Sequence, residues 1–454
     1  MTTDVVILAA GQGSRMRSQL PKVLHPLAGK PMVRHVIDAA KSFTDARLHV
    51  VIGHGAELVR EALIDENVTF AVQSEQKGTG HAVAQVLGNI DDGKVLILYG
   101  DVPLIRPETL TALLEQVDEH HLGLLTVTMA QPKGYGRIVR DIDGHVTAIV
   151  EEKDATEEQR LIQECNTGIL ATTGAQLKRW LPALSANNAQ GEYYLTDIIA
   201  MAASEGILIA TTEPATSTEV QGVNDRVQLS ALERVYQSWQ VEALMREGAS
   251  IADPKRVDVR GHVEVGRDVL IDVGCIFEGD VTLADGVSVG PYSVIRNSRI
   301  GAGTVIDAYS LIDGAEIEGE NTIGPYARLR PGTSLARGAR IGNFVETKNA
   351  RIGAGSKINH LSYVGDASLG QGVNVGAGTI TCNYDGVNKH HTEIGDNVFV
   401  GSNSALVAPV NIGSGATIAA GSTITDQVEN DSLAIARGRQ VQKSDWVRPA
   451  KRQS

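Results

Sequence analysis

Two glycines and two cations near the N-terminus have the spacing of a phosphate-binding loop. The segment Ala9 to Arg17 reads A-A-G-Q-G-S-R-M-R, and a P-K dipeptide ending at Lys22 follows it. Gly11 and Gly13 carry no Cβ, so the backbone can approach a ligand closely and its N–H groups can hold phosphate oxygens. Arg15 and Lys22 would then neutralise a triphosphate during phosphoryl transfer. The alternative for a lone G-x-G is an ordinary turn between a strand and a helix.

A second candidate group combines an acidic residue at the end of a strand with polar residues before it. Asp101 follows the apolar run V-L-I-L-Y-G, where a carboxylate is costly unless a cation pairs with it. Magnesium prefers hard oxygen ligands, so Asp101 and the side-chain oxygen of Asn224 predict a metal site that also uses phosphate oxygens. Gln73, Gly78 and Thr79 offer amide and backbone groups that can read the edge of a uracil ring. The alternative for Asp101 is a helix N-cap.

Three polar residues in the second half favour a different chemistry, and two of them break the pattern of a regular repeat. Arg330 and Lys348 stand where the repeat has small residues, and two such cations suit a phosphate. His360 lies in the segment N-H-L-S-Y-V-G-D and could act as a general base that deprotonates an ammonium group near neutral pH. The alternative for His360 is a surface residue without function.

The elements that must position the first two groups alternate between short apolar strands and helical segments. The strands are predicted at Val5 to Ala10, Leu48 to Gly53 and Val95 to Gly100. This alternation predicts a mostly parallel sheet covered by helices. Apolar residues at three- and four-residue steps from Leu229 to Leu244 predict one amphipathic helix that ends before Gly248.

An aliphatic residue recurs at every sixth position through most of the second half. The repeat begins at Val265, slips by one residue at several points, is interrupted for 12 residues after Thr381 and ends at Ile418. This hexapeptide pattern predicts a parallel β-helix of triangular coils, each ~18 residues long and stacked at ~4.8 Å. The composition also changes near residue 247, since 29 of the 48 glycines follow it. The predicted parts are a first domain at 1–226, a helical linker at 227–247 and a β-helix with a basic tail at 248–454.

The composition limits the classes of protein to which the chain can belong. Of 454 residues, 42% are hydrophobic and 21% charged, which fits a globular protein with more than one domain. A net charge of −13 argues against general affinity for nucleic acid or anionic membranes. No apolar run reaches the ~18 residues of a membrane span and no basic leader precedes the first strand, so we expect a cytoplasmic protein. Cys165, Cys275 and Cys382 form no C-x-x-C pair, which excludes a thiolate zinc site.

Both halves resemble known enzyme families. The first is similar to the sugar-1-phosphate nucleotidyltransferases, whose loop usually reads L-x-x-G-x-G-T-R-M with P-K downstream; Ser14 replaces the threonine but keeps the hydroxyl. Further matching segments are S-E-Q-K-G-T-G-H-A from Ser74, Y-G-D-V-P from Tyr99, G-Y-G-R-I from Gly134, E-E-K-D from Glu151, N-T-G-I from Asn166 and G-V-N-D-R from Gly222. The second half is similar to the hexapeptide acyltransferases through N-F-V-E-T-K from Asn343 and G-A-G-T-I-T-C-N-Y-D-G from Gly376. Nearly the whole chain resembles the bacterial bifunctional enzymes that make UDP-N-acetylglucosamine.

The resemblance implies a role for each matching residue. Contacts to UTP or the nucleotide sugar are implied for Leu8, Ala9, Ala10, Gly11, Lys22, Gln73, Gly78, Thr79, Tyr99, Gly100, Asp101, Gly136, Glu151, Asn166 and Asn224. Arg15 and Lys22 would be catalytic, and Asp101 and Asn224 would bind Mg2+. Glucosamine 1-phosphate would be held by Arg330, Lys348, Tyr363, Asn374 and Lys389, with His360 as the catalytic base. Acetyl-CoA would lie along Ala377, Asn383, Tyr384, Ser402, Ala420 and Arg437.

The resemblance also implies a fold, an order of reactions and an assembly. The fold would be an α/β Rossmann-like nucleotidyltransferase domain, joined by a long helix to an all-β left-handed parallel β-helix. Acetyl-CoA would first acetylate glucosamine 1-phosphate, and the product would then attack the α-phosphorus of UTP, with magnesium as cofactor, to give UDP-N-acetylglucosamine and pyrophosphate. The subunits would form a homotrimer with acetyl-transfer sites between them.

Two alternatives remain open at this point. The chain could be a nucleotidyltransferase whose β-helix only forms trimers, or a non-catalytic sensor of nucleotide sugars. Arg330, Lys348 and His360 argue against the first alternative, and the intact Arg15 and Lys22 argue against the second.

Overall fold

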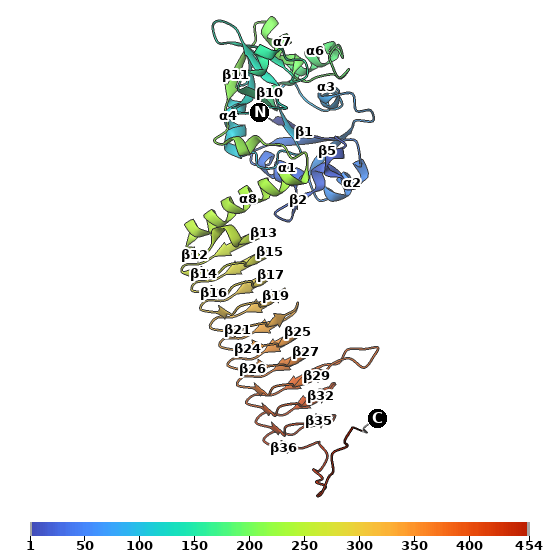
Figure 1. Cartoon of the computed structure of the whole chain (residues 1–454), viewed down its shortest axis with the longest axis vertical. Coiled ribbons are helices and arrows are strands. Elements are labelled where there is room, and N and C mark those ends of the chain that lie inside the picture. The colour runs from blue at the N-terminus through green and yellow to red at the C-terminus, as the bar shows by residue number, and fades with distance from the viewer. Residues whose placement is uncertain (1, 452–454) are drawn as a thin grey trace. The chain divides into compact units, whose positions relative to one another are not determined.

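The computed structural model describes residues 2–451, which form two compact units (Figure 1). The division falls between Tyr236 and Gln237, inside helix α8 (Arg226–Glu247). The helix predicted from the apolar spacing is therefore present. The last three residues of the predicted basic tail lie outside the described residues. None of the described helices combines the length and the apolar character needed to span a membrane.

The first unit is built on a nine-stranded sheet in the order β11-β7-β10-β6-β1-β4-β5, with the β8–β9 hairpin paired to β10. The strands are β1 (Thr3–Ala9), β4 (Ala46–Ile52), β5 (Val68–Val72), β6 (Lys94–Tyr99), β7 (His121–Thr128), β8 (Arg137–Arg140), β9 (Val146–Val150), β10 (Glu164–Thr173) and β11 (Leu208–Thr212), and β2 (Pro26–Leu27) with β3 (Lys30–Pro31) form a separate small pair. The three predicted strands are confirmed as β1, β4 and β6, and they are parallel. Strand β10 runs antiparallel to β6 and β7, so the sheet is mixed.

Helices cover both faces of this sheet because its central strands are apolar on both sides. Val5 and Ile7 of β1 belong to one core cluster, which includes α1 and α4, and Val6 and Leu8 belong to the other, which includes α3, α6 and α7. The helices are α1 (Met32–Ala40), α2 (Ala56–Ala62), α3 (Thr79–Ala84), α4 (Pro107–Glu115), α5 (Glu157–Arg160), α6 (Gly174–Trp180) and α7 (Asp197–Ser204). Leu8 of β1 pairs with Tyr99 of β6, so the loops after these two parallel strands leave the same edge of the sheet.

The second unit is a parallel β-helix, as the hexapeptide repeat predicts. One sheet contains β12 (Ala249–Ile251), β14 (Val269–Ile271), β16 (Ser288–Val289), β18 (Val305–Ile306), β21 (Thr322–Ile323), β24 (Arg340–Asn343), β26 (Lys357–His360), β28 (Asn374–Val375), β31 (Phe399–Val400), β34 (Thr417–Ile418) and β36 (Leu433–Ala434). A branched sheet contains β13 (Asp258–Val265), β15 (Ile276–Leu283), β17 (Val294–Ile300), β19 (Leu311–Asp313), β20 (Glu316–Ile317), β22 (Arg328–Leu329), β23 (Ser334–Leu335), β25 (Glu346–Ile352), β27 (Tyr363–Leu369), β29 (Ile380–Cys382), β30 (Thr392–Ile394), β32 (Ala405–Val407), β33 (Val410–Ile412) and β35 (Thr423–Ile424).

The repeat positions point into the core of the β-helix and stack on one another. Ile295 pairs in register with Ile312, Ile312 with Leu329, Leu329 with Thr347 and Thr347 with Val364, and all five are buried. Each coil therefore places the same face of the chain above the last, so residues about 17 positions apart become neighbours on the outer surface. This stacking brings the polar residues of the second half together.

Candidate active sites

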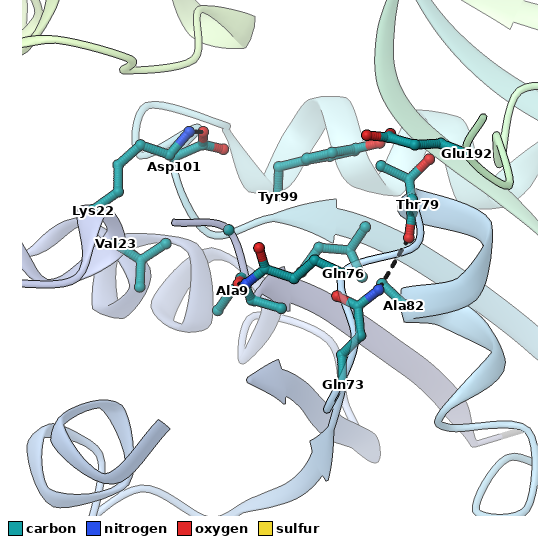
Figure 2. Close-up of a pocket in the computed structure, with 14 residues that line it drawn as sticks. Ala9, Lys22, Val23, Gln73, Gln76, Thr79, Ala82, Tyr99, Asp101 and Glu192 are labelled. Carbon is teal, nitrogen blue, oxygen red and sulfur yellow. Dashed lines mark hydrogen bonds and ion pairs between the residues drawn. The ribbon is translucent and has the colours of Figure 1, made fainter. Parts of the chain in front are cut away.

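The first candidate site is a cavity of about 330 Å³ at the carboxyl ends of β1 and β6 (Figure 2). It is lined by Leu8, Ala9, Ala10, Gly11, Lys22, Val23, Gln73, Gln76, Gly78, Thr79, Ala82, Tyr99, Asp101 and Glu192. Most predicted nucleotide-binding residues therefore share one cavity. Gly100 is buried and is not among the lining residues, and it donates its backbone N–H to the carbonyl oxygen of Leu8 at 2.9 Å.

Cations and oxygen ligands meet at one end of this cavity. The Lys22 ammonium forms an ion pair with Asp101, and its Nζ lies 3.4 Å from Oδ1 of Asn224. The Arg15 guanidinium donates to the same Asn224 oxygen at 2.8 Å. The backbone N–H of Val223 donates to the Asp101 carbonyl at 2.9 Å, which holds the Asn224 loop beside β6. A carboxylate and an amide oxygen thus already converge on one cation, which fits a magnesium site in donor type and arrangement.

The two glycines of the phosphate-binding loop have different roles in the structure. A Cβ on Gly11 would meet no atom within 4 Å, so this glycine leaves the backbone open to a ligand. Gly13 has a φ of 61°, and a Cβ there would lie 2.5 Å from the Cβ of Lys22. Gly13 therefore makes room for the Lys22 side chain, which the sequence pattern did not indicate.

The uracil-binding residues of the prediction form the opposite wall of the cavity. Buried Gln73 donates from Nε2 to the carbonyl oxygen of Gly78 at 3.1 Å, and Thr79 accepts at Oγ1 from the N–H of Leu195 at 3.0 Å. Gln76 also lines the cavity and donates to the Ala10 carbonyl at 2.8 Å, which ties this wall to the phosphate-binding loop. These contacts fix the segment that would face a base.

The predicted sugar-binding residues are close neighbours as well. The N–H of Asn166 donates to the Gly136 carbonyl at 2.9 Å, and a Cβ built on Gly136 would lie 3.5 Å from either carboxylate oxygen of Glu151. Burial raises the pKa of Glu151, and the nearby carboxylates of Asp154 and Asp197 raise it further, against a hydrogen bond from Thr196.

Tyr99 and Gly168 connect the sugar-binding residues to the cavity. Gly168 has a φ of 87°, and a Cβ there would lie 2.6 Å from the Tyr99 ring. Its N–H donates to Oδ1 of Asn166 at 2.9 Å. The N-T-G segment therefore folds tightly against the Tyr99 ring. Sequence reasoning missed Glu192, which lines the cavity from a loop that carries no motif.

The second candidate site is on the outer surface of the β-helix and centres on His360. His360 ends β26 and pairs in register with Asn343, which ends β24. Its Nδ1 lies 2.7 Å from Oδ1 of Asn343. With the amide oxygen as acceptor, Nδ1 carries the proton and Nε2 keeps its lone pair. His360 is exposed, so Nε2 can reach a ligand outside the coil.

A cluster of cations lies on the adjoining face. The N–H of Arg330 donates to the Thr347 carbonyl at 2.9 Å, which places Arg330 one coil from Lys348. The Lys389 ammonium lowers the pKa of Lys348 most, and burial and then Arg330 lower it further. Arg330 donates to Oε1 of Glu346 at 2.8 Å, and Glu346 pairs in register with Tyr363. Asn374 is on the rung after His360, where it pairs with Lys357.

The residues predicted for acetyl-CoA follow one another along successive coils. The Ala377 carbonyl accepts from the N–H of Asn403, the Ser402 carbonyl accepts from the N–H of Gly421, each at 2.8 Å, and the Ala420 carbonyl accepts from Arg437 at 2.5 Å. Such a column, at about 4.8 Å per rung, suits an elongated ligand. Tyr384 begins the loop that replaces the interrupted repeat, and its hydroxyl donates to the Gly386 carbonyl at 2.5 Å.

The chain matches two family models and many full-length relatives. The MobA-like NTP transferase domain matches residues 5–167, and the bacterial transferase hexapeptide family (six repeats) matches residues 262–297 and 391–426. The chain is 69% identical over 451 residues to the bifunctional protein GlmU of Chromohalobacter salexigens, covering 99% of this chain and 100% of that one. It is 60% identical to GlmU of Marinobacter nauticus, covering 98% and 99%, and 58% identical to GlmU of Burkholderia vietnamiensis, covering 99% and 100%.

Proposed function

The chain belongs to the GlmU family of bifunctional enzymes, and we propose that each of its two units carries one of the two reactions of this family. The enzyme acetylates glucosamine 1-phosphate with acetyl-CoA and transfers a uridylyl group from UTP to N-acetylglucosamine 1-phosphate, which gives UDP-N-acetylglucosamine and pyrophosphate. One observation supports the assignment of the reactions to separate units. The proposed nucleotide-binding residues lie within residues 1–236 and the proposed acetyl-transfer residues within 237–454.

In uridylyl transfer, a phosphate oxygen of the sugar phosphate attacks the α-phosphorus of UTP while the bond to pyrophosphate breaks. This reaction needs alignment and charge neutralisation more than a base. Arg15 and Lys22 would neutralise the triphosphate at the mouth of the cavity. Asp101 and Asn224 would hold Mg2+, which when bound supplies further positive charge to the phosphate oxygens. Glu151 would accept hydrogen bonds from sugar hydroxyls in the buried half of the site.

In acetyl transfer, Nε2 of His360 would remove a proton from the substrate ammonium. The free amine then attacks the thioester carbonyl, so that a C–N bond forms and the C–S bond breaks. The nitrogen loses its second proton as the amide forms, and the departing CoA thiolate takes up that proton. The N–H of Ala377 would stabilise the negative oxygen of the intermediate. Arg330, Lys348 and Lys389 would hold the sugar phosphate.

The acetyl-transfer unit is also the proposed site of assembly. Hexapeptide repeats indicate oligomerisation, and we extend this to a homotrimer in which a neighbouring subunit covers the exposed acetyl-CoA column. His360, Tyr384 and Lys389 are all exposed in the single chain. The cytoplasm, which supplies UTP and acetyl-CoA, is the proposed location.

The test follows free thiol and pyrophosphate separately in the same purified protein. His360→Ala should lower thiol release about 10²- to 10⁴-fold and leave pyrophosphate release from UTP and N-acetylglucosamine 1-phosphate unchanged. Asp101→Asn should have the reverse effect. His262→Ala replaces another exposed histidine of the β-helix and serves as the matched control. If the wild-type enzyme releases no thiol, or if His360→Ala loses both activities while folded, the assignment of the two reactions is wrong.

A further inference from the structure

A buried carboxylate lies between the two groups of proposed acetyl-transfer residues. Asp366 on β27 is only 8% exposed, although no role is assigned to it above. Asn349 donates to Oδ1 of Asp366 at 2.7 Å, and Asn383 donates to Oδ2. A buried carboxylate is costly unless its oxygens have partners, and here both oxygens have one.

The charges around Asp366 come from the phosphate-binding cluster. Burial by itself raises the pKa of Asp366, but the amides of Asn349 and Asn383 and then the ammonium groups of Lys389 and Lys348 outweigh it, so the pKa lies below its ordinary value. Asp366 is thus ionised at neutral pH. Gly365, the residue before Asp366, pairs in register with Lys348, and Oδ2 of Asp366 accepts a hydrogen bond from Asn383.

Charged neighbours act on Lys348 with opposite signs. Lys389 of the loop and Arg330 beyond β22 both lower its pKa, and the charge of Asp366 on β27 opposes them. Glu346 of the same strand forms its ion pairs with Arg328 and Arg330. Asp366 is therefore the carboxylate whose charge raises the pKa of Lys348.

We propose that Asp366 is a positioning residue for acetyl transfer, whose carboxylate orients Asn383 toward acetyl-CoA and keeps Lys348 and Lys389 together beside the sugar phosphate. The inference rests on the proposed function, because it uses the ligand assignments of these three residues. A single buried carboxylate would then help to position the residues that bind both substrates. Loss of the charge should therefore weaken the use of both substrates.

The backbone allows a clean substitution at this position. Asp366 has a φ of 46°, and Asn349, its neighbour in register at the same corner, has a φ of 45°. Asparagine therefore adopts the conformation that Asp366→Asn requires. Asn349 and Asn383 donate to different oxygens of Asp366, and an amide replaces one of these oxygens with an NH2 donor, so one of the two hydrogen bonds is lost. Asp366→Asn thus removes the charge and one hydrogen bond with little change of shape.

The experiment measures thiol release by full-length Asp366→Asn against each substrate in turn. We expect kcat/KM for glucosamine 1-phosphate and for acetyl-CoA to fall about 10- to 100-fold, the range for a hydrogen bond to a charged group. The alkaline limb of kcat/KM for glucosamine 1-phosphate should move to lower pH, because Lys348 loses the charge that opposes Lys389 and Arg330. In an Asn383→Ala background, Asp366→Asn should have a smaller effect on acetyl-CoA. Asp268→Asn, at an exposed position with a φ of 57°, is the control.

The possible outcomes distinguish failure of this inference from failure of the proposed function. Unchanged kinetics and an unchanged alkaline limb in folded Asp366→Asn would overturn the positioning role. Retained thiol release in His360→Ala would overturn the proposed site instead. If Asp366→Asn does not fold, Asn383→Asp tests the same contact, because two facing carboxylates share a proton only at low pH. Its acetyl transfer should then decline as pH rises, and a wild-type pH profile would refute the inference.

Discussion

Asn343 offers a precise test of how the β-helix prepares its proposed catalytic base. Its side chain is 2.7 Å from Nδ1 of His360, and strand register alone brings the two residues together. Removal of the amide in Asn343→Ala leaves His360 in place but frees its ring to rotate and to carry its proton on Nε2. Only the tautomer that carries its proton on Nδ1 can accept a proton from the substrate at Nε2.

The expected loss follows from the one contact that is removed. A neutral hydrogen bond contributes about 0.5–1.5 kcal/mol net, which corresponds to a roughly 2- to 13-fold decrease in rate. Removal of the base itself in His360→Ala should cost about 10²- to 10⁴-fold. Asn343→Ala should therefore be impaired but far more active than His360→Ala, with the loss in kcat rather than in KM.

Thiol release under saturating substrates measures this difference directly. Asn411→Ala, the same substitution at an exposed position of β33, controls for changes in the coil. Asn343→Asp keeps an acceptor for Nδ1 and should recover most of the activity. Wild-type kcat in Asn343→Ala, or a loss as large as that of His360→Ala, would refute the idea that this amide sets the tautomer.

Four further outcomes test other parts of the structure. Burial and neighbouring carboxylates raise the pKa of Glu151 above 4.5. As the pH is lowered and Glu151 becomes protonated, kcat/KM for N-acetylglucosamine 1-phosphate should therefore decrease, and Glu151→Gln should remove this acidic limb of the pH profile. Gly168→Ala should lower the free energy of unfolding by roughly 1–3 kcal/mol in denaturant titrations, because its Cβ would meet the Tyr99 ring. Burial raises the pKa of Cys275 to about 11, so iodoacetamide at pH 8 should label it only after unfolding. Chelation by EDTA should stop pyrophosphate release and leave thiol release intact, and equal loss of both would contradict separate sites.

The β-helix could be predicted from the sequence because its core has a simple periodic rule. Ile300, Ile306 and Ile312 are buried at every sixth position, and the fold needs only that such residues recur. The antiparallel course of β10 had no comparable signal, because a buried strand has the same apolar composition in either direction. Periodicity thus predicts which residues form the core, but not whether each strand runs parallel or antiparallel to its neighbours.

The missing site residues show a second limit. The sequence motifs include Asn383 but give no role to Asn349 and Asp366. The three residues are spaced 17 positions apart and become neighbours only through the register of successive coils. The slips in the repeat make that register hard to count from the sequence. Glu192 was missed for a different reason, since it reaches the nucleotide cavity from a loop outside every motif.

The two sites differ in what a single chain supplies, and this difference bears on assembly. The proposed nucleotide site is a cavity whose lining residues all lie within residues 8–192 of the first unit. The proposed acetyl-transfer residues instead lie on the outer surface of a coil, with His360, Ser402 and Ala420 exposed. Exclusion of water would protect the thioester from hydrolysis and strengthen the contacts to the developing negative charge, so a cover would benefit this exposed surface more than the first site. If a neighbouring subunit is that cover, dilution to protein concentrations at which the subunits dissociate should abolish thiol release before it affects pyrophosphate release. Parallel loss of both activities on dilution would instead mean that the assembly supports the fold rather than the acetyl-transfer site.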